Sequence, residues 1–426
     1  MIYPVFAAYA RDLHGATPAR IGLALGAYGL SQGLLQIPFG LLSDRIGRKT
    51  MIAVGLLLFG AGSAVAALAT SIDGMLIGRI LQGTGAVGAV ILALVADLTR
   101  EENRTRAMAM VGISIGLSFV FAIVAGPALA GIIGVSGIFW MMVALALLGI
   151  AITRWGVPTP HRPKTHRDAE TVPALLGQVL RNRELLRLDA GIFILHAILT
   201  ASFLTLPHLL RDSFSLASEE QWVIYLPVLA VSVLLMVPAI VVGEKRRRMK
   251  EVFVTAILVL MASQVGFAFG APDQATVLVA AIAFFTAFTL AEATLPSLVT
   301  KVAPAGAKGT ATGVYSSAQF LGIFFGGGVG GWVLAAGGAP GTFLFTAALA
   351  AVWFIVAATM DRPGRHSTYV ARIGGAAADV GRLAAELERL PGVVEVVVVA
   401  EDETAYLKID RDSFDPREVD RVVNAM

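Results

Sequence analysis

Two ionisable side chains, Arg79 and Glu292, lie inside long apolar segments of this chain. An ionisable group in a membrane interior is costly, and it commonly marks a proton, ion or substrate pathway. Glu292 is our first choice for a group that takes up and releases a proton, because a carboxyl in low dielectric can be held neutral. His196 is the next candidate. The alternatives are a structural hydrogen bond for Glu292, packing for His196, and for Arg79 a side chain that extends to the outer membrane surface.

A cluster of charged residues follows the first long apolar segment, in the sequence GLLSDRIGRK at 40–49. Asp44 closes one predicted helix near the start of the next, where the helix dipole favours a carboxylate. Arg48 can reach an acid at a neighbouring helix end, and the expected partner is Asp97, which closes another span on the same face. Gly40 would permit close packing against a helix from the other half of the protein. The alternative is a basic loop that only sets topology. The predicted conformational switch comprises Gly40, Asp44, Arg45, Gly47, Arg48 and Asp97.

Weaker signals lie elsewhere in the apolar segments. Gly126, Pro127 and Gly131 would allow a kink and close helix packing, and the same residues also suit a purely structural role. A longer set of polar and aromatic side chains could line a substrate cavity of mixed character, although each could instead be a packing residue. These residues are Tyr28, Gln32, Gln36, Gln264, Phe285, Phe288, Tyr315 and Gln319.

Composition determines the class of protein that must position these side chains. Hydrophobic residues make up 56% of the 426 residues and charged residues 15%, whereas soluble domains carry about 25% charged residues. The apolar runs are long enough for membrane-spanning helices. The chain has no cysteine, and its 6 histidines include no HxxxH pair, so we expect no metal site and no cofactor. No nucleophile–base set suggests an enzyme, and a net charge of +3 argues against nucleic-acid binding.

A full span needs about 20 apolar residues, and the sequence predicts eleven of them. They are 19–42, 50–70, 75–97, 107–131, 136–157, 189–210, 221–243, 251–271, 275–300, 310–336 and 340–360. An apolar segment at Met1–Tyr9 is too short to cross a bilayer and resembles the end of another helix. We therefore expect roughly 20–30 further residues before Met1, enough to complete a span.

Lysine and arginine residues are distributed unequally between alternate connections. One set of connections contains 20 of them and the other set contains 3. Because cytoplasmic loops carry the excess of basic residues, the first set is predicted to be cytoplasmic, and so is the region that follows the last span. The basic set comprises 43–50, 97–106, 154–187, 244–250 and 301–308.

The apolar region repeats itself. Asp44-Arg45 and Glu244-Lys245 each follow a span and lie 200 residues apart, which is typical of transporters built from two parallel halves. The region between the halves carries an amphipathic segment at 174–187 that we expect to lie on the membrane surface, the alternative being a solvated linker. The predicted units are 1–157, the linker 158–188, 189–360, a short linker 361–366, and a C-terminal domain at 367–426.

The C-terminal domain is predicted to be a small α+β unit with the order βαββα, which is ferredoxin-like without the final strand. The expected elements are a strand at 368–373, a helix with Val380, Leu383, Leu387 and Leu390 on one face, a hairpin of 393–399 and 405–409, and a helix capped by Asp415. The hairpin turns at 401–403. The region 361–426 carries a net charge of −4, so we expect it to contact basic cytoplasmic connections, 244–250 or 158–188. An unknown cytoplasmic partner is the alternative.

Three motifs resemble those of the major facilitator superfamily. The sequence at 40–49 is similar to the loop signature GxLxDRxGRK, and the sequence at 79–85 to RxxQGxG. The sequence at 126–131 is similar to GPxxGG of the antiporter branch, with Ala130 in place of one glycine, and the pattern over 1–360 looks like the drug/proton antiporters. The resemblance implies twelve helices in two halves of six, with the first helix mostly missing here. It also implies that the loop at 40–49 latches the outward-open state, and that Arg79 takes part in proton transfer.

The resemblance further implies a bacterial inner-membrane protein that exports a small organic or amphiphilic solute in exchange for protons by alternating access. We expect a monomer whose partners are the solute, protons and the lipid bilayer. The C-terminal domain is similar to metallochaperone-like folds, but Gly374-Gly375 stands near the place of their CxxC motif, so thiolate metal binding is excluded. Two alternatives remain: a membrane sensor that signals through its C-terminal domain, and a lipid or lysolipid transporter.

Overall fold

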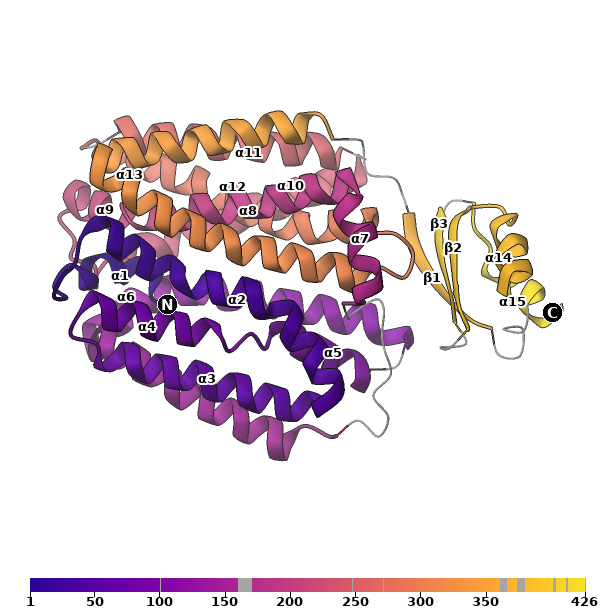
Figure 1. Ribbon diagram of the computed structural model, residues 1–426. Coiled ribbons are helices and arrows are strands. Elements are labelled where there is room, and N and C mark those ends of the chain that lie inside the picture. The colour runs from indigo at the N-terminus through magenta and orange to yellow at the C-terminus, as the bar shows by residue number, and fades with distance from the viewer. Residues whose placement is uncertain are drawn as a thin grey trace.

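The computed structural model consists of a large helical body and a small α+β domain at the C-terminal end (Figure 1). The residues that it describes are 1–99, 101–159, 171–246, 248–270, 272–360, 366–373, 380–400, 404–410 and 413–425. The predicted turn at 401–403, the predicted linker residues 361–365, Gly374-Gly375 and most of the Pro-containing segment 158–170 lie outside the described residues.

The first half of the helical body contains the helices up to residue 156. Helix α4 ends at Gly83 and α5 begins at Gly88, so the single span predicted at 75–97 is interrupted in its middle. The elements are α1 (Tyr3–Ala10), α2 (Pro18–Ile46), α3 (Arg48–Leu68), α4 (Ile72–Gly83), α5 (Gly88–Leu98), α6 (Glu101–Ala151) and a π-helical turn η1 (Ile152–Gly156).

The second half begins after an amphipathic helix, α7, which lies at the same end of the helical body as the α+β domain (Figure 1). The span predicted at 189–210 is divided at Leu204–Thr205 into two helices. The elements are α7 (Pro173–Arg181), α8 (Arg183–Phe203), α9 (Leu206–Phe214), α10 (Trp222–Lys245), α11 (Met249–Phe269), α12 (Gln274–Val302) and α13 (Lys308–Ala358).

Each half ends in a helix of 51 residues that is broken once by a glycine. In α6 the break is Gly134, with φ 69°, and in α13 it is Gly338, with φ 63°. A glycine adopts positive φ without the steric penalty of a side chain, so the chain turns there without a loop. The breaks fall beside the boundaries predicted between 107–131 and 136–157 and between 310–336 and 340–360. Eight helical segments of the described residues, these two included, are long and apolar enough to cross a membrane.

Helices α2 and α13 bring the two halves into close contact. A Cβ placed at Gly22 would lie 2.2 Å from the Gly327 backbone oxygen, and one at Gly29 would lie 2.4 Å from the Phe320 oxygen. Such spacing is possible only for glycine, and it lets two backbones approach without side chains between them. Gly40 differs from the sequence-based expectation, because the nearest atom to a Cβ there is Ala89 Cβ of the same half, at an ordinary 3.6 Å.

The C-terminal domain has the order βαββα that the sequence predicts. Its elements are β1 (His366–Arg372), α14 (Val380–Glu388), β2 (Val393–Val399), β3 (Thr404–Asp410) and α15 (Pro416–Ala425). The sheet is antiparallel in the order β1-β3-β2, so the hairpin strand β3 is central. Leu383 and Leu387 of α14 are fully buried in its core, and the backbone N–H of Arg417 donates to Asp415 Oδ1 at 3.0 Å, which confirms the predicted cap.

The free face of this sheet packs on the connection between α12 and α13, while α14 and α15 lie on its far face (Figure 1). Tyr406 and Val399 contact Ala305, and Lys408 Nζ donates to the backbone oxygens of Val302 and Ala303 at 3.2 and 3.3 Å. Among the described residues, the domain thus contacts 302–305, within the basic connection 301–308. Contact with 244–250 or 158–188 stays a prediction.

Candidate functional site

Arg48 connects the ends of three helices at the loop 40–49. Its Nε donates to Asp97 Oδ2 at 3.1 Å, and its Nη1 donates to Ser43 Oγ at 2.7 Å and to Asp44 Oδ1. The side chains of Arg48 and Asp97 are buried, at 4% and 0% exposure, whereas that of Asp44 is 40% exposed. The predicted pairing of Arg48 with Asp97 is confirmed. We call Ser43, Asp44, Arg48 and Asp97 the Arg48 cluster.

The Arg48 cluster borders a cleft between the two halves. Gly40, Asp44 and Arg48 line the cleft on one side. Gly309 and Gly313 of α13 lie on the other side, together with the hydroxyl-bearing Thr312 and Ser316. Gly47, with φ 94°, forms the turn between α2 and α3 that places Arg48 at the start of α3. The cluster is thus positioned where any movement between the halves would change its surroundings.

Arg79 is buried in the first half and does not extend to the membrane surface. Its Nη1 donates to Gln82 Oε1 at 2.6 Å and its Nη2 to the Leu25 backbone oxygen at 3.2 Å. The guanidinium carbon also lies 5.0 Å from the centre of the Tyr28 ring, within the range of a cation–π interaction. Gln82 in turn donates to Ser63 Oγ at 2.7 Å. A neutral amide, a carbonyl and an aromatic face therefore hold this cation, without an ion pair among the described residues.

Glu292 and His196 meet through an amide in the second half. Gln319 Nε2 lies 2.9 Å from His196 Nε2 and donates to Glu292 Oε1 at 3.2 Å. The second carboxyl oxygen, Glu292 Oε2, lies 3.8 Å from His196 Nε2 and has no hydrogen-bond partner among the described residues. The Glu292 side chain is 35% exposed, so part of it borders open space. Three helices contribute to this group: α8, α12 and α13. We call it the Glu292 cluster.

The structure brings together Glu292, His196 and Gln319, but it places Arg79 in a separate group. His196 Nδ1 lies 3.3 Å from the Ile192 backbone oxygen one turn earlier, which leaves Nε2 for Gln319. Between the two groups, Tyr3 Oη and Thr200 Oγ1 lie 3.4 Å apart and link α1 to α8. Sequence spacing gave no signal for this link, because the two residues are 197 positions apart.

The residues of the GPxxGG-like motif lie in α6 near the start of the chain. A Cβ at Gly126 would lie 2.1 Å from the Met1 backbone oxygen, and one at Gly131 would lie 3.3 Å from Glu219 Cβ. Pro127 lies inside the helix. The close approach at Gly126 is a packing contact between α6 and the N-terminal segment, so this geometry fits the structural reading of the motif.

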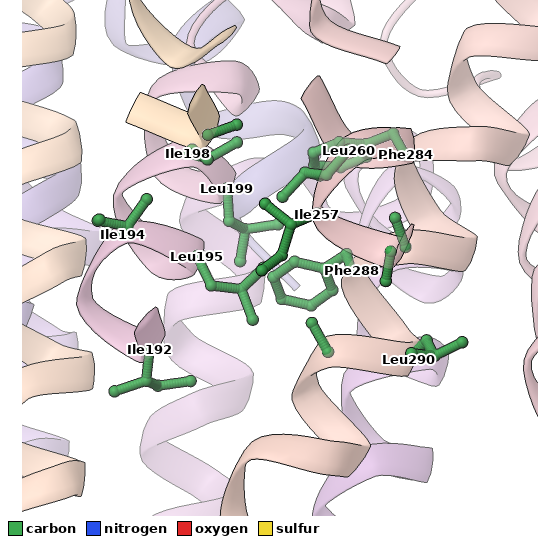
Figure 2. Close-up of a cluster of buried hydrophobic side chains, with 14 of the residues drawn as sticks. Ile192, Ile194, Leu195, Ile198, Leu199, Ile257, Leu260, Phe284, Phe288 and Leu290 are labelled. Atoms are coloured by element: carbon green, nitrogen blue, oxygen red, sulfur yellow. The ribbon is translucent and has the colours of Figure 1, made fainter. Parts of the chain in front are cut away.

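Several residues proposed for a substrate cavity are instead buried in the core of the second half. Figure 2 shows Phe288 among Leu195, Leu199 and Ile257, and Phe285 belongs to the same apolar cluster. Gln264 is fully buried, and its Oε1 accepts from Ser202 Oγ and Thr346 Oγ1 at 3.0 and 2.8 Å. These three residues help to hold α8, α11, α12 and α13 together.

The remaining cavity candidates lie along the contact between the halves. Tyr28 meets Phe320 of α13 edge-on, with ring centres 6.1 Å apart. Gln32 Nε2 donates to Gln36 Oε1 at 3.4 Å, and Gln36 lines the cleft beside the Arg48 cluster. Tyr315 is buried, with a hydroxyl that has no hydrogen-bond partner among the described residues. Asp189 of α8 is also buried and was not singled out from the sequence, because it stands at the edge of an apolar run.

Comparisons with known proteins agree with this architecture. Residues 1–327 match the Major Facilitator Superfamily. The chain is 43% identical over 424 residues to the inner membrane transport protein YajR of Escherichia coli K12, covering 99% of this chain and 93% of that protein. It is 28% identical over 344 residues to the multidrug resistance protein MdtH of Aeromonas salmonicida, covering 77% of this chain and 80% of that protein.

A solved structure supports the fold. The bacterial homologue of the human lysosomal transporter Spinster, in an inward-facing and occupied conformation, superposes with a TM-score of 0.65. It is 16% identical in sequence, and the match covers 84% of this chain and 91% of that chain.

Proposed function

Because this chain belongs to the Major Facilitator Superfamily, a family of multi-pass membrane transporters, we propose that it couples protons to the export of a small organic or amphiphilic solute. The observation that carries the proposal is the hydrogen-bonded Glu292 cluster. A carboxyl, an imidazole and an amide from three helices meet there inside an apolar body. Ionisable groups in such a place are the usual sites of proton relays.

The Glu292 cluster has the parts that a proton-coupling site requires. One carboxyl oxygen of Glu292 accepts a hydrogen bond from Gln319. Oε2 has no hydrogen-bond partner in the part of the chain that the structure describes, and it is the expected position of the proton. Release of that proton would place a negative charge 3.8 Å from His196 Nε2. This charge would change the hydrogen bond that Gln319 donates to Glu292. Gln319 lies on α13, the helix that packs on α2 of the other half. Protonation can therefore bias the contact between the halves.

The Arg48 cluster supports alternating access at the other end of the same contact. We infer that it latches the outward-open state, because it borders the cleft between α2 and α13 and contains a buried ion pair. Rocking of the halves would change the surroundings of Asp44, the exposed member. The buried Arg48–Asp97 pair would keep α3 and α5 together within the first half during that movement.

The solute class rests on relatives and on the apolar character of the helical body. MdtH is named a multidrug resistance protein. The helical body offers aromatic and amide side chains such as Tyr28 and Gln36 along the contact between its halves. The α+β domain is proposed to lie in the cytoplasm, since it docks on the basic connection 301–308.

The test begins with a thermal-shift screen of the purified chain against drugs, sugars, amino acids and lipids. A compound that stabilises the protein is then used in proteoliposomes with and without an imposed pH gradient. We expect the gradient to drive accumulation by the wild-type chain. Glu292→Gln should lose gradient-driven accumulation but keep the thermal shift and solute exchange at equal pH, because the amide cannot release a proton.

Asp273→Asn is the matched control, since Asp273 is an exposed carboxylate that caps α12 through the Thr276 N–H. It should transport as the wild type does. Gradient-driven accumulation that survives in Glu292→Gln would refute coupling at Glu292. Equal transport with and without the gradient in the wild type would instead indicate a facilitator, including one for lipids.

A further inference from the structure

Asp189 is a buried carboxyl that the Glu292 cluster does not use. The residue is 7% exposed, and neither Oδ1 nor Oδ2 has a hydrogen-bond partner among the described residues. It lies seven residues before His196 on α8, which is about two helical turns, so the two side chains share a face. Asp189 is therefore displaced from the Glu292 cluster toward the end of α8 that carries Arg183 and Arg187.

The packing of α8 on α13 shows what Asp189 faces. A Cβ at Gly322 would lie 2.2 Å from the Phe193 backbone oxygen, and one at Gly326 would lie 2.2 Å from the Ala197 oxygen. From the first contact to the second, the position moves four residues forward on α8 and four residues forward on α13, so the two helices are in parallel register. Four residues earlier on both helices, the same register sets Asp189 beside position 318 of α13, three residues after Tyr315.

Tyr315 lies on α13 about one turn before Gln319, whose Nε2 donates to Glu292 Oε1, and three residues before position 318, which the register sets beside Asp189. Its side chain is buried. The hydroxyl has no hydrogen-bond partner among the described residues, although it can both donate and accept. Three oxygens without hydrogen-bond partners among the described residues, two on Asp189 and one on Tyr315, thus lie on the facing helices α8 and α13.

The basic side chains of Arg187 and Lys250 form hydrogen bonds with other groups, so they do not explain the carboxyl at position 189. Arg187 donates to Glu184 Oε1 and to the Thr359 backbone oxygen, and Lys250 donates to the Ala358 and Met360 backbone oxygens. Of the titratable groups described above, His196 follows Asp189 by two turns on α8, Tyr315 lies on the facing helix α13, and Glu292 lies on α12. A buried carboxyl without a cation or a hydrogen bond is costly unless it carries a proton.

We propose that Asp189 is a second proton-carrying carboxyl, and that Tyr315 passes protons between it and Glu292. In each step the Tyr315 hydroxyl gives its proton to one carboxylate and receives a proton from the other carboxylic acid. One proton moves, one O–H bond forms for each that breaks, and no redox partner is required. Asp189 then connects the Glu292 cluster to the basic end of α8. The inference rests on the proposed coupling at Glu292.

The experiment uses pH-difference infrared spectroscopy of the purified full chain in lipid nanodiscs, which detects protonated buried carboxyls without a known solute. The wild type should show two titrating carboxyl bands. Asp189→Asn should lose one and keep the other, and Glu292→Gln should lose the second. After a pH jump, Tyr315→Phe should keep both bands but slow the response of the Glu292 band about 100-fold, as expected for loss of a positioned proton-transfer group.

The controls separate this inference from the proposed function. Asp273→Asn should leave both bands unchanged. Asp189→Glu keeps the carboxyl and should shift its band, which provides a reading if Asp189→Asn fails to fold. A spectrum unchanged by Asp189→Asn, an unshifted band in Asp189→Glu, or an unchanged Glu292 response in Tyr315→Phe would overturn the proton path through Asp189. A spectrum unchanged by Glu292→Gln would overturn the coupling site itself.

Discussion

Arg48 Nε donates to Asp97 Oδ2 at 3.1 Å and joins the start of α3 to the end of α5. The two residues are 49 positions apart, and both side chains are almost fully buried. The same guanidinium also contacts Asp44, whose side chain is 40% exposed. One arginine therefore serves a buried contact inside the first half and an exposed contact at the cleft, and these two contacts should respond differently to substitution.

Asp97→Asn should destabilise the protein far more than Asp44→Asn. Removing one partner of a buried ion pair leaves a charge without compensation, at a cost of about 3 to 5 kcal/mol. A partly exposed pair contributes only about 0 to 1 kcal/mol. The measurement is unfolding in denaturant, followed by intrinsic fluorescence of both variants. Equal losses of stability would contradict the different burial of the two carboxylates.

Asp44→Lys should shift the balance between conformations rather than the stability. The introduced ammonium would lie beside Arg48 at the cleft, where like charges repel, and this should loosen the contact that we propose as a latch. Distances between spin labels on the ends of α2 and α13 would report the change. Arg45→Lys preserves the charge of the neighbouring position and serves as the control. Unchanged distances and unchanged transport in Asp44→Lys would refute the latch.

Gly22→Ala should disturb the contact between the halves. The added Cβ would lie 2.2 Å from the Gly327 backbone oxygen, so the helices must move apart, at a cost of roughly 1 to 3 kcal/mol. Gly116→Ala is the matched control, because no neighbouring atom lies within 4 Å of its Cβ position. There alanine should be neutral or stabilising by up to about 1 kcal/mol, through its higher helix propensity. The midpoint of thermal unfolding of both variants, measured in the same detergent, checks this prediction. A Gly22→Ala variant more stable than the wild type would contradict the close packing.

Docking of the α+β domain should strengthen as the pH rises toward the ordinary pKa of lysine. Burial lowers the pKa of Lys408 below its usual 10.5, while neighbouring Glu395 opposes the shift and Lys308 adds to it. The docked state therefore binds fewer protons than an undocked domain would, and the docked fraction grows between the lowered pKa and 10.5.

Spin labels on α15 and α12 would measure the docked fraction of Lys408 variants between neutral pH and pH about 10. Lys408→Met should remove the pH dependence, because methionine has no titrating group. Arg382→Met, on the far-face helix α14, is the control and should retain it. A docked fraction that falls as the pH rises, or a pH dependence that persists in Lys408→Met, would contradict this linkage.

The sequence predicted features that depend on local patterns. Apolar periodicity and length were sufficient for the spans, and turn and cap residues such as Asp415 were sufficient for the order of the α+β domain. The Arg48–Asp97 pair was also predictable, because both residues close or open helices at the same end of the body. Each of these inferences depended on residues that are close in sequence, or on helix ends that lie at the same face of the membrane.

Features that depend on the approach of distant helices were not predictable. Gln319 was placed among weak cavity candidates, yet it joins His196 and Glu292, because only the packing of α8, α12 and α13 brings the three side chains together. Gln264 has the same residue type and a different environment, a hydrogen-bonded core. The contact of the α+β domain with Ala305 was not predicted, because net charge does not encode the fit of Tyr406 and Val399 around that residue.

The breaks at Gly134 and Gly338 have a consequence for how this protein meets its surroundings. A turn made within one residue joins the two helices without a loop, and the residues at each break, 131–134 and 335–338, are exposed. The short connection keeps the two helix ends close together at the break. The two breaks are therefore points at which a label could be attached, in addition to Arg11-Asp12 and the residues around Glu219.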